Sequence, residues 1–185
     1  MASLLLRLKH WQVFLLLFVV PFLLQYGLKE LFRVTGVGIS DAVEVLLDAL
    51  PAVFYLSWLW CVGLYLHRRL PSGIRVRSIY LHLAALYFLG YTFLLLYTLV
   101  IVRDNVLTGN LPLGMLLLLV PMHLFATFCF LYIIYFDARS VASVEEQRVV
   151  EFGEYGGLIL QFLFLPVGIW FLQPRLRKLF YGDLM

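Results

Sequence analysis

The chain has 185 residues, of which 63% are hydrophobic and only 14% are charged. Soluble domains are nearer half apolar and a quarter charged, and a domain of this size has too much surface to hide such an excess. The composition therefore excludes a soluble globular enzyme and an intrinsically disordered chain. Two cysteines are too few for a disulfide scaffold. An integral membrane protein remains.

Five stretches without Asp, Glu, Lys or Arg are long enough to cross a bilayer: residues 11–28, 49–66, 79–102, 111–136 and 155–172. A spanning helix needs about 20 mostly apolar residues, and a charge at the bilayer centre costs at least ~2.5 kcal/mol. The strands of a transmembrane barrel alternate apolar and polar residues, whereas several of these runs are apolar on every face. The sequence predicts one all-α domain, a bundle of about five transmembrane helices.

The positive charges predict how the bundle is oriented. Residues 67–78 carry four arginines and no acid, so this loop is placed in the cytoplasm. The N-terminus, with Arg7 and Lys9, is then also cytoplasmic, and it lacks the small-x-small cleavage pattern of a signal peptide. Residues 137–154 are predicted to be a water-exposed cytoplasmic connection, in which Ser143 and Glu146 fit the capping box of a short surface helix.

The C-terminal charges leave two alternatives for the fifth segment. If it crosses fully, Arg175, Arg177 and Lys178 lie outside, and Lys and Arg divide 8 inside to 6 outside. If it is re-entrant and turns near Pro166 and Gly168, the division is 11 to 3. We favour a full crossing on the sequence, because re-entrant backbone must be buried in protein and a small bundle offers little cover.

Acidic residues at the start of the second helix form the first candidate site. Asp41, Glu44 and Asp48 share one helix face near the positive end of the helix dipole. One interpretation is an entrance for a cation or substrate. The favoured alternative is ion pairing with Lys29 and Arg33, because charges near a membrane interface usually find partners. That alternative predicts that exchanging the charges of Lys29 and Glu44 restores folding lost in the single substitutions.

Tyrosines and a histidine form the second candidate site. Tyr80, Ala84, Tyr87 and Tyr91 follow a helical spacing on the third span, and His123 lies near the middle of the fourth. A pocket between the second, third and fourth helices would be lined by four candidate ligand-binding residues, namely Asp48, Tyr87, Tyr91 and His123. The alternative is ordinary packing, since hydroxyl and small residues are favoured between membrane helices.

The sequence predicts no cofactor and no metal site. His82 and His123 differ in depth by roughly 15 Å, which is too far for one haem. The chain contains no His-Glu-x-x-His, Walker or Gly-x-Ser-x-Gly pattern, so we expect no catalytic activity. The arginine loop is too short and too poor in aromatic residues to predict nucleic-acid binding.

Small residues in the fifth segment predict a helix interface, because glycine lets backbones meet and a buried glutamine needs a partner. The candidates are Gly153, Gly156, Gly157 and Gln161. The first two glycines are three residues apart, so the prediction does not rest on a GxxxG motif.

The run Phe-Leu-Pro-Val-Gly-Ile-Trp-Phe-Leu-Gln-Pro-Arg-Leu at 164–176 resembles a group of uncharacterised small multipass membrane proteins of Bacteroidota, as does the run at 50–55. The resemblance covers about the last third of the chain. It implies a bacterial cytoplasmic membrane and no particular activity. We expect an accessory or interaction subunit or scaffold in the lipid bilayer, with a protein partner or a second copy of itself. The alternative is a binder or transporter of a small molecule or lipid.

Overall fold

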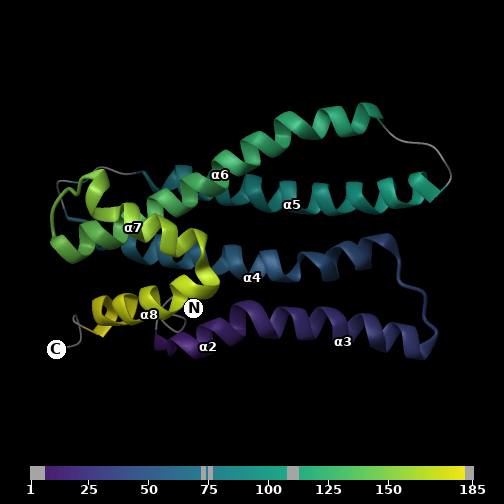
Figure 1. The fold of residues 1–185 in the computed structure, drawn as a ribbon, viewed down its shortest axis with the longest axis horizontal. Coiled ribbons are helices and arrows are strands. Elements are labelled where there is room, and N and C mark those ends of the chain that lie inside the picture. The colour runs from purple at the N-terminus through teal and green to yellow at the C-terminus, as the bar shows by residue number, and fades with distance from the viewer. Residues whose placement is uncertain (1–6, 72–73, 75–76, 108–112, 182–185) are drawn as a thin grey trace.

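The computed structural model describes residues 7–71, 74, 77–107 and 113–181 of the chain. Within them every regular element is a helix (Figure 1). In chain order the elements are α2 (His10–Phe14), the π-helical turn η1 (Leu15–Val19), α3 (Val20–Thr35), α4 (Asp41–His67), α5 (Ser78–Leu107), α6 (Leu113–Glu146), α7 (Phe152–Leu163) and α8 (Leu165–Tyr181). The predicted all-α helix bundle is therefore confirmed.

Four helical stretches are long and apolar enough to cross a membrane. They are His10–Thr35, which joins α2, η1 and α3, and the stretches Asp41–His67, Ser78–Arg103 and Leu113–Glu146. Figure 1 shows these stretches packed lengthwise and alternating in direction. They match the first four predicted spans and are longer, because helices continue into polar flanks where charged side chains reach water.

The fifth predicted span is not one helix, so the prediction of a single spanning helix over residues 155–172 was wrong. Residues 155–172 are split between α7 and α8, which form a hairpin around Phe164, where the backbone leaves helical geometry at ψ 51°. Figure 1 shows α8 running back toward the end of the bundle from which α7 starts. The re-entrant alternative describes this geometry.

Local chemistry explains the turn between α7 and α8. Pro166 has no N–H and is tolerated in the first turn of α8. The Phe164 carbonyl accepts hydrogen bonds from Val167 and Gly168, at 3.0 and 2.8 Å. A Cβ atom on Gly168 would overlap with the backbone of Gln161, so only glycine permits this close approach of α8 to α7.

The buried core lies in the half of the bundle that holds the hairpin. Trp58 of α4 is 1% exposed, and its ring centroid lies 6.1 Å from that of Phe162 in α7. Leu165, Ile169 and Leu172 of α8 are fully buried in the same cluster. One face of the hairpin is therefore covered by protein, whereas Phe164, Val167 and Phe171 on its other face are more than half exposed.

The prediction of a water-exposed connection over residues 137–154 is also wrong for its first part, residues 137–146. Helix α6 continues without interruption to Glu146, and Ser143 is fully buried instead of capping a surface helix. Ala138 and Val141 belong to the buried core. The reason is that α7 and α8 pack against this end of α6 and exclude water from it.

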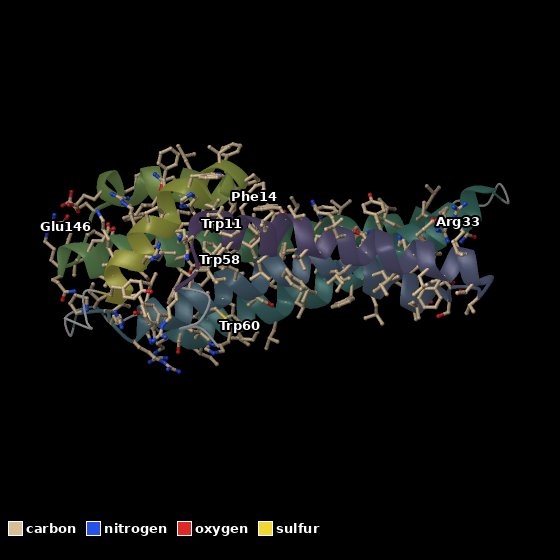
Figure 2. All side chains as sticks on the ribbon, turned by 90° about the horizontal axis from the view of Figure 1, so that it is seen from below. Trp11, Phe14, Arg33, Trp58, Trp60 and Glu146 are labelled. Carbon is tan, nitrogen blue, oxygen red and sulfur yellow. The ribbon has the colours of Figure 1, made fainter. Side chains whose placement is uncertain are left out.

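Positive charges gather at one end of the bundle. This is the end where α4 finishes and α5 begins; Figure 2 shows Arg33 at the opposite end of the molecule from Glu146. Among the described residues this end and its neighbouring turns hold ten Lys or Arg residues, and the opposite end holds three. The ten are Arg7, Lys9, Arg68, Arg69, Arg77, Arg139, Arg148, Arg175, Arg177 and Lys178, and the three are Lys29, Arg33 and Arg103. We call the first the basic end.

Candidate functional site

The acidic residues of α4 are held by ion pairs. Asp48 accepts hydrogen bonds from Lys29 Nζ and Gln25 Nε2 of α3, both at 2.5 Å. Glu44 pairs instead with Arg103 of α5, at 2.9 Å from its guanidinium. The geometry agrees with the ion-pairing alternative for Lys29, which pairs with Asp48, whereas Arg33 pairs with Glu30 of its own helix at 2.6 Å. A charge exchange between Lys29 and Glu44 would therefore not restore a native contact.

Three of the four predicted pocket residues lie together between α5 and α6. The Tyr91 hydroxyl lies 2.7 Å from His123 Nδ1, and the Tyr87 hydroxyl donates to the Met122 carbonyl at 3.3 Å. These bonds join α5 to α6. The described partners of Asp48 are on α3 instead, so the structure does not bring this fourth residue into the same site.

An apolar groove of about 690 Å³ lies beside these bonds, between α5 and α6. This volume is in the range of small-molecule sites. Its lining consists of Tyr80, Leu83, Ala84, Leu86, Tyr87, Phe125, Phe128, Cys129 and Tyr132. We call it the α5–α6 groove. Tyr87 is the predicted residue that lines it, whereas Tyr91 and His123 lie outside its lining.

The groove has a floor of small side chains and walls of large ones. Ala84 and Cys129 are buried at 7% and 5% exposure, whereas Leu83 and Phe128 are more than half exposed. The α6 residues that line the groove, from Phe125 to Tyr132, follow three-and-four spacing and so share one helix face. This stripe of residues on the fourth span was visible in the sequence and indicates one face of the groove. The predicted site was built around His123 and did not include it.

The groove ends toward the basic end in tyrosines followed by arginines. Tyr135 continues the α6 stripe, with its ring centroid 6.3 Å from that of Tyr132. Arg139 comes one turn later and donates to the Tyr135 hydroxyl at 2.9 Å. Directly before α5, the exposed Arg77 precedes Tyr80 by three residues. Sequence reasoning used these arginines only as topology signals.

Asp137 is a buried carboxylate that sequence reasoning placed in water. Its side chain is fully buried between α4, α5 and α6, against Gly63 and Leu81. Neither carboxylate oxygen has a hydrogen-bond partner among the described residues. The available signal was the apolar pattern on both sides of it, because Ile133 and Val141, each one turn away, continue one helix face.

The predicted glycine interface of α7 is not used inside the described chain. Nothing lies within 4 Å of a Cβ placed on Gly153 or Gly157, and one placed on Gly156 meets only Phe152 of the same helix. Gly153 and Gly157 are four residues apart, so they do form a GxxxG spacing, which the comparison of Gly153 with Gly156 overlooked.

Gln161, the fourth predicted interface residue, lies at the α7–α8 turn. Its side-chain oxygen is buried without a hydrogen-bond partner among the described residues. Its backbone is the surface that α8 approaches at Gly168. The structure therefore gives Gln161 a place in the hairpin, separate from the two exposed glycines.

Comparison with protein families, curated proteins and solved structures finds no match to this chain. Within the part of the chain that the structure describes, no three His, Cys, Asp or Glu side chains gather as a metal site would require. The α5–α6 groove is the candidate functional site that the described residues offer.

Proposed function

We propose that this protein is a non-catalytic binding protein of the bacterial cytoplasmic membrane that holds an acyl chain of a lipid in the α5–α6 groove. The observation that supports this proposal is the groove itself: an apolar hollow of about 690 Å³ on the side of two membrane-length helices. Ligand sites of this kind are mostly apolar, with a few polar groups that fix orientation.

The lining of the groove favours an acyl chain over a partner helix. Helices that meet within a membrane use small residues, so that their backbones approach closely. Here five of the nine lining residues are aromatic, and only Ala84 and Cys129 are small. Large rings around a narrow floor suit a flexible chain, which adapts to the space between them.

The charge distribution supports the orientation that goes with this proposal. Cytoplasmic flanks of membrane helices carry an excess of Lys and Arg. The basic end holds ten of these residues against three at the other end, so the N-terminus and α8 belong on the cytoplasmic side. The resemblance to membrane proteins of Bacteroidota supports the bacterial cytoplasmic membrane.

Native mass spectrometry of the protein, extracted gently from its own membrane, tests the proposal. We expect a bound species of lipid mass on the wild type. Ala84→Phe fills the floor of the groove and should remove that species. Ala42→Phe makes the same substitution at an exposed site in the first turn of α4, outside the groove, and should leave the species in place.

A second variant guards against misfolding of Ala84→Phe. Phe128→Ala removes a half-exposed wall of the groove without crowding it and should weaken retention, whereas Phe22→Ala on the exposed face of α3 should not. A thermal-shift measurement verifies that each variant is folded. If folded Ala84→Phe and Phe128→Ala both keep the bound lipid, the groove does not hold it and the proposal is wrong.

A second candidate function is that of an accessory subunit which meets a protein partner or a second copy through α7. It is supported by Gly153 and Gly157, which are exposed and four residues apart on one helix face. Cross-linking in native membranes should give a discrete complex that Gly157→Leu abolishes. A complex that survives Gly157→Leu would exclude this face of α7 as the interface.

A further inference from the structure

We propose that the lipid held in the α5–α6 groove is an anionic phospholipid, whose phosphate is bound by Arg139 and Arg77 at the basic end. This inference rests on the proposed function and names the class of its ligand. The observation that supports it is the set of polar groups that follow both walls of the groove toward the basic end.

An arginine follows the last tyrosine on each wall of the groove: Arg139 on α6, and Arg77 in the residue directly before α5. On α6 the order is Tyr132, Tyr135 and Arg139, which follow each other at three and four residues. On the other wall, Arg77 lies directly before α5, which begins at Ser78, three residues from Tyr80. The end of α6 and the start of α5 both lie at the basic end, so the two arginines lie on the same side of the groove.

Arg139 has hydrogen-bond donors to spare. A guanidinium carries five N–H donors, and the described contact of Arg139 uses one of them for the Tyr135 hydroxyl. No carboxylate lies within 4.0 Å of Arg139 or Arg77 among the described residues. A half-buried guanidinium without an anion is a fitting partner for a phosphate, which it can bind through two parallel hydrogen bonds.

A second polar group lies next to Arg139. A small hollow beyond the mouth of the groove is lined by Tyr135, Arg139, Ser140 and Ser143, among others. Ser143 is fully buried, and its hydroxyl has no hydrogen-bond partner among the described residues. The hollow has room for about one water molecule, at about 10 Å³, so it adds polar groups beside Arg139 and does not itself hold a headgroup.

The remaining charges at this end favour an anionic headgroup over a zwitterionic one. Asp137, two residues before Arg139, is fully buried against Gly63, and two further acids are paired, Glu145 with Arg175 and Glu154 with Arg148. The mouth of the groove therefore keeps a net positive charge. An anionic headgroup balances that charge, whereas the ammonium of a zwitterionic headgroup is repelled by it, and basic sites between helices on the cytoplasmic side suit anionic lipids.

A lipid competition with the purified full-length chain tests this inference. The delipidated protein is titrated with an equimolar mixture of dioleoyl phosphatidylglycerol and dioleoyl phosphatidylethanolamine, and native mass spectrometry counts the bound molecules. We expect the anionic lipid to be preferred about tenfold or more. Arg139→Gln and Arg77→Gln should each reduce that preference about fivefold. Lys178→Gln, on the exposed face of α8 at the same end, should not change it.

The outcomes separate this inference from the proposed function. Equal binding of both lipids by the wild type, abolished by Ala84→Phe, would overturn the anionic headgroup and leave the groove as a lipid site. Binding that is indifferent to Ala84→Phe and Phe128→Ala would overturn the groove itself. An equal loss of preference in Lys178→Gln and Arg139→Gln would show that only the overall charge of the basic end matters, and would also overturn the inference.

Discussion

Asp137 is the residue whose environment departs most from what its chemistry prefers. A buried polar group without a hydrogen bond costs free energy, and a buried carboxylate costs more. Both oxygens of Asp137 lack a partner among the described residues, and one of them lies where a Cβ on Gly63 would stand. Ionisable residues inside membrane helices usually have a role beyond packing, and the burial of this carboxylate lowers the stability of the fold.

Truncating Asp137 should therefore be unusually mild. We expect Asp137→Ala to lower the free energy of unfolding by less than about 1 kcal/mol, or to raise it, because the loss of two unsatisfied oxygens offsets the small cavity. Ile133→Ala, at an equally buried position one turn earlier, should cost about 2–5 kcal/mol. Thermal or denaturant unfolding in detergent compares the two. A cost for Asp137→Ala equal to that of Ile133→Ala would mean that the carboxylate has a stabilising partner.

The α7–α8 hairpin is the element that sets this bundle apart from a simple row of spanning helices. Its apolar side chains complete the core at the basic end, and its turn depends on the missing side chain of Gly168. The π-helical turn η1 is a comparable local adjustment, since it ends two residues before Pro21, which supplies no N–H to the helical hydrogen bonds.

Gly168 should be the least replaceable glycine of the hairpin. Gly168→Ala drives a Cβ into the Gln161 backbone, so we expect a large fall in the melting temperature and rapid proteolysis near residue 164. Gly153→Ala in α7 meets nothing within 4 Å and should be neutral or stabilising by up to about 1 kcal/mol through helix propensity. Limited proteolysis and thermal shift report both effects. Equal stability of the two variants would show that the hairpin does not close as described.

The start of α7 should respond to acid. Glu154 accepts hydrogen bonds from Arg148 and from the Glu151 N–H, and these bonds lower the pKa of Glu154 below its usual value. A carboxylate whose pKa is lower in the folded state stabilises the fold above its usual pKa and loses that contribution as the pH falls through the folded value.

We therefore expect Glu154→Gln to melt below the wild type at pH 6, and the two to converge as the pH is lowered past about 4. Melting curves recorded over this range measure the difference. A gap that stays constant at acid pH would mean that the ionised Glu154 contributes nothing to the hairpin.

At the scale of the whole molecule, the hairpin sets the end of the bundle at which the C-terminal positive charges lie. With α8 returning to the basic end, Arg175, Arg177 and Lys178 lie on the same side as Arg69, whose guanidinium donates to the Leu179 carbonyl at 2.7 Å. The distribution of positive charge is then strongly asymmetric, as the positive-inside rule favours.

Both ends of the chain should consequently face the cytoplasm. A green fluorescent protein fused after residue 185, which becomes fluorescent only when it folds in the cytoplasm, should be bright. A fusion truncated after residue 38, in the connection between α3 and α4, should be dark. A dark full-length fusion would restore the full crossing of residues 155–172 and contradict the re-entrant hairpin.

The sequence by itself determined that this chain is a membrane protein, and it located the first four membrane-length helices. Lipid acts on each residue through hydropathy, so the charge-free runs at 11–28, 49–66, 79–102 and 111–136 could be read directly. Tyr87 and Tyr91 could be placed on one face of their span, because helical spacing fixes which residues of one helix share a face, whereas their contact with His123 and Met122 is a tertiary contact.

Only the tertiary structure decided the fate of residues 137–172. Asp137 ends an apolar run and looks like the start of a loop, but the neighbours packed around it in space keep it inside a helix. The α7–α8 hairpin packs one face on α2 and α6, and the α5–α6 groove depends on how far two helix faces stand apart. These features arise from contacts between segments distant in the chain, which local hydropathy and spacing do not encode.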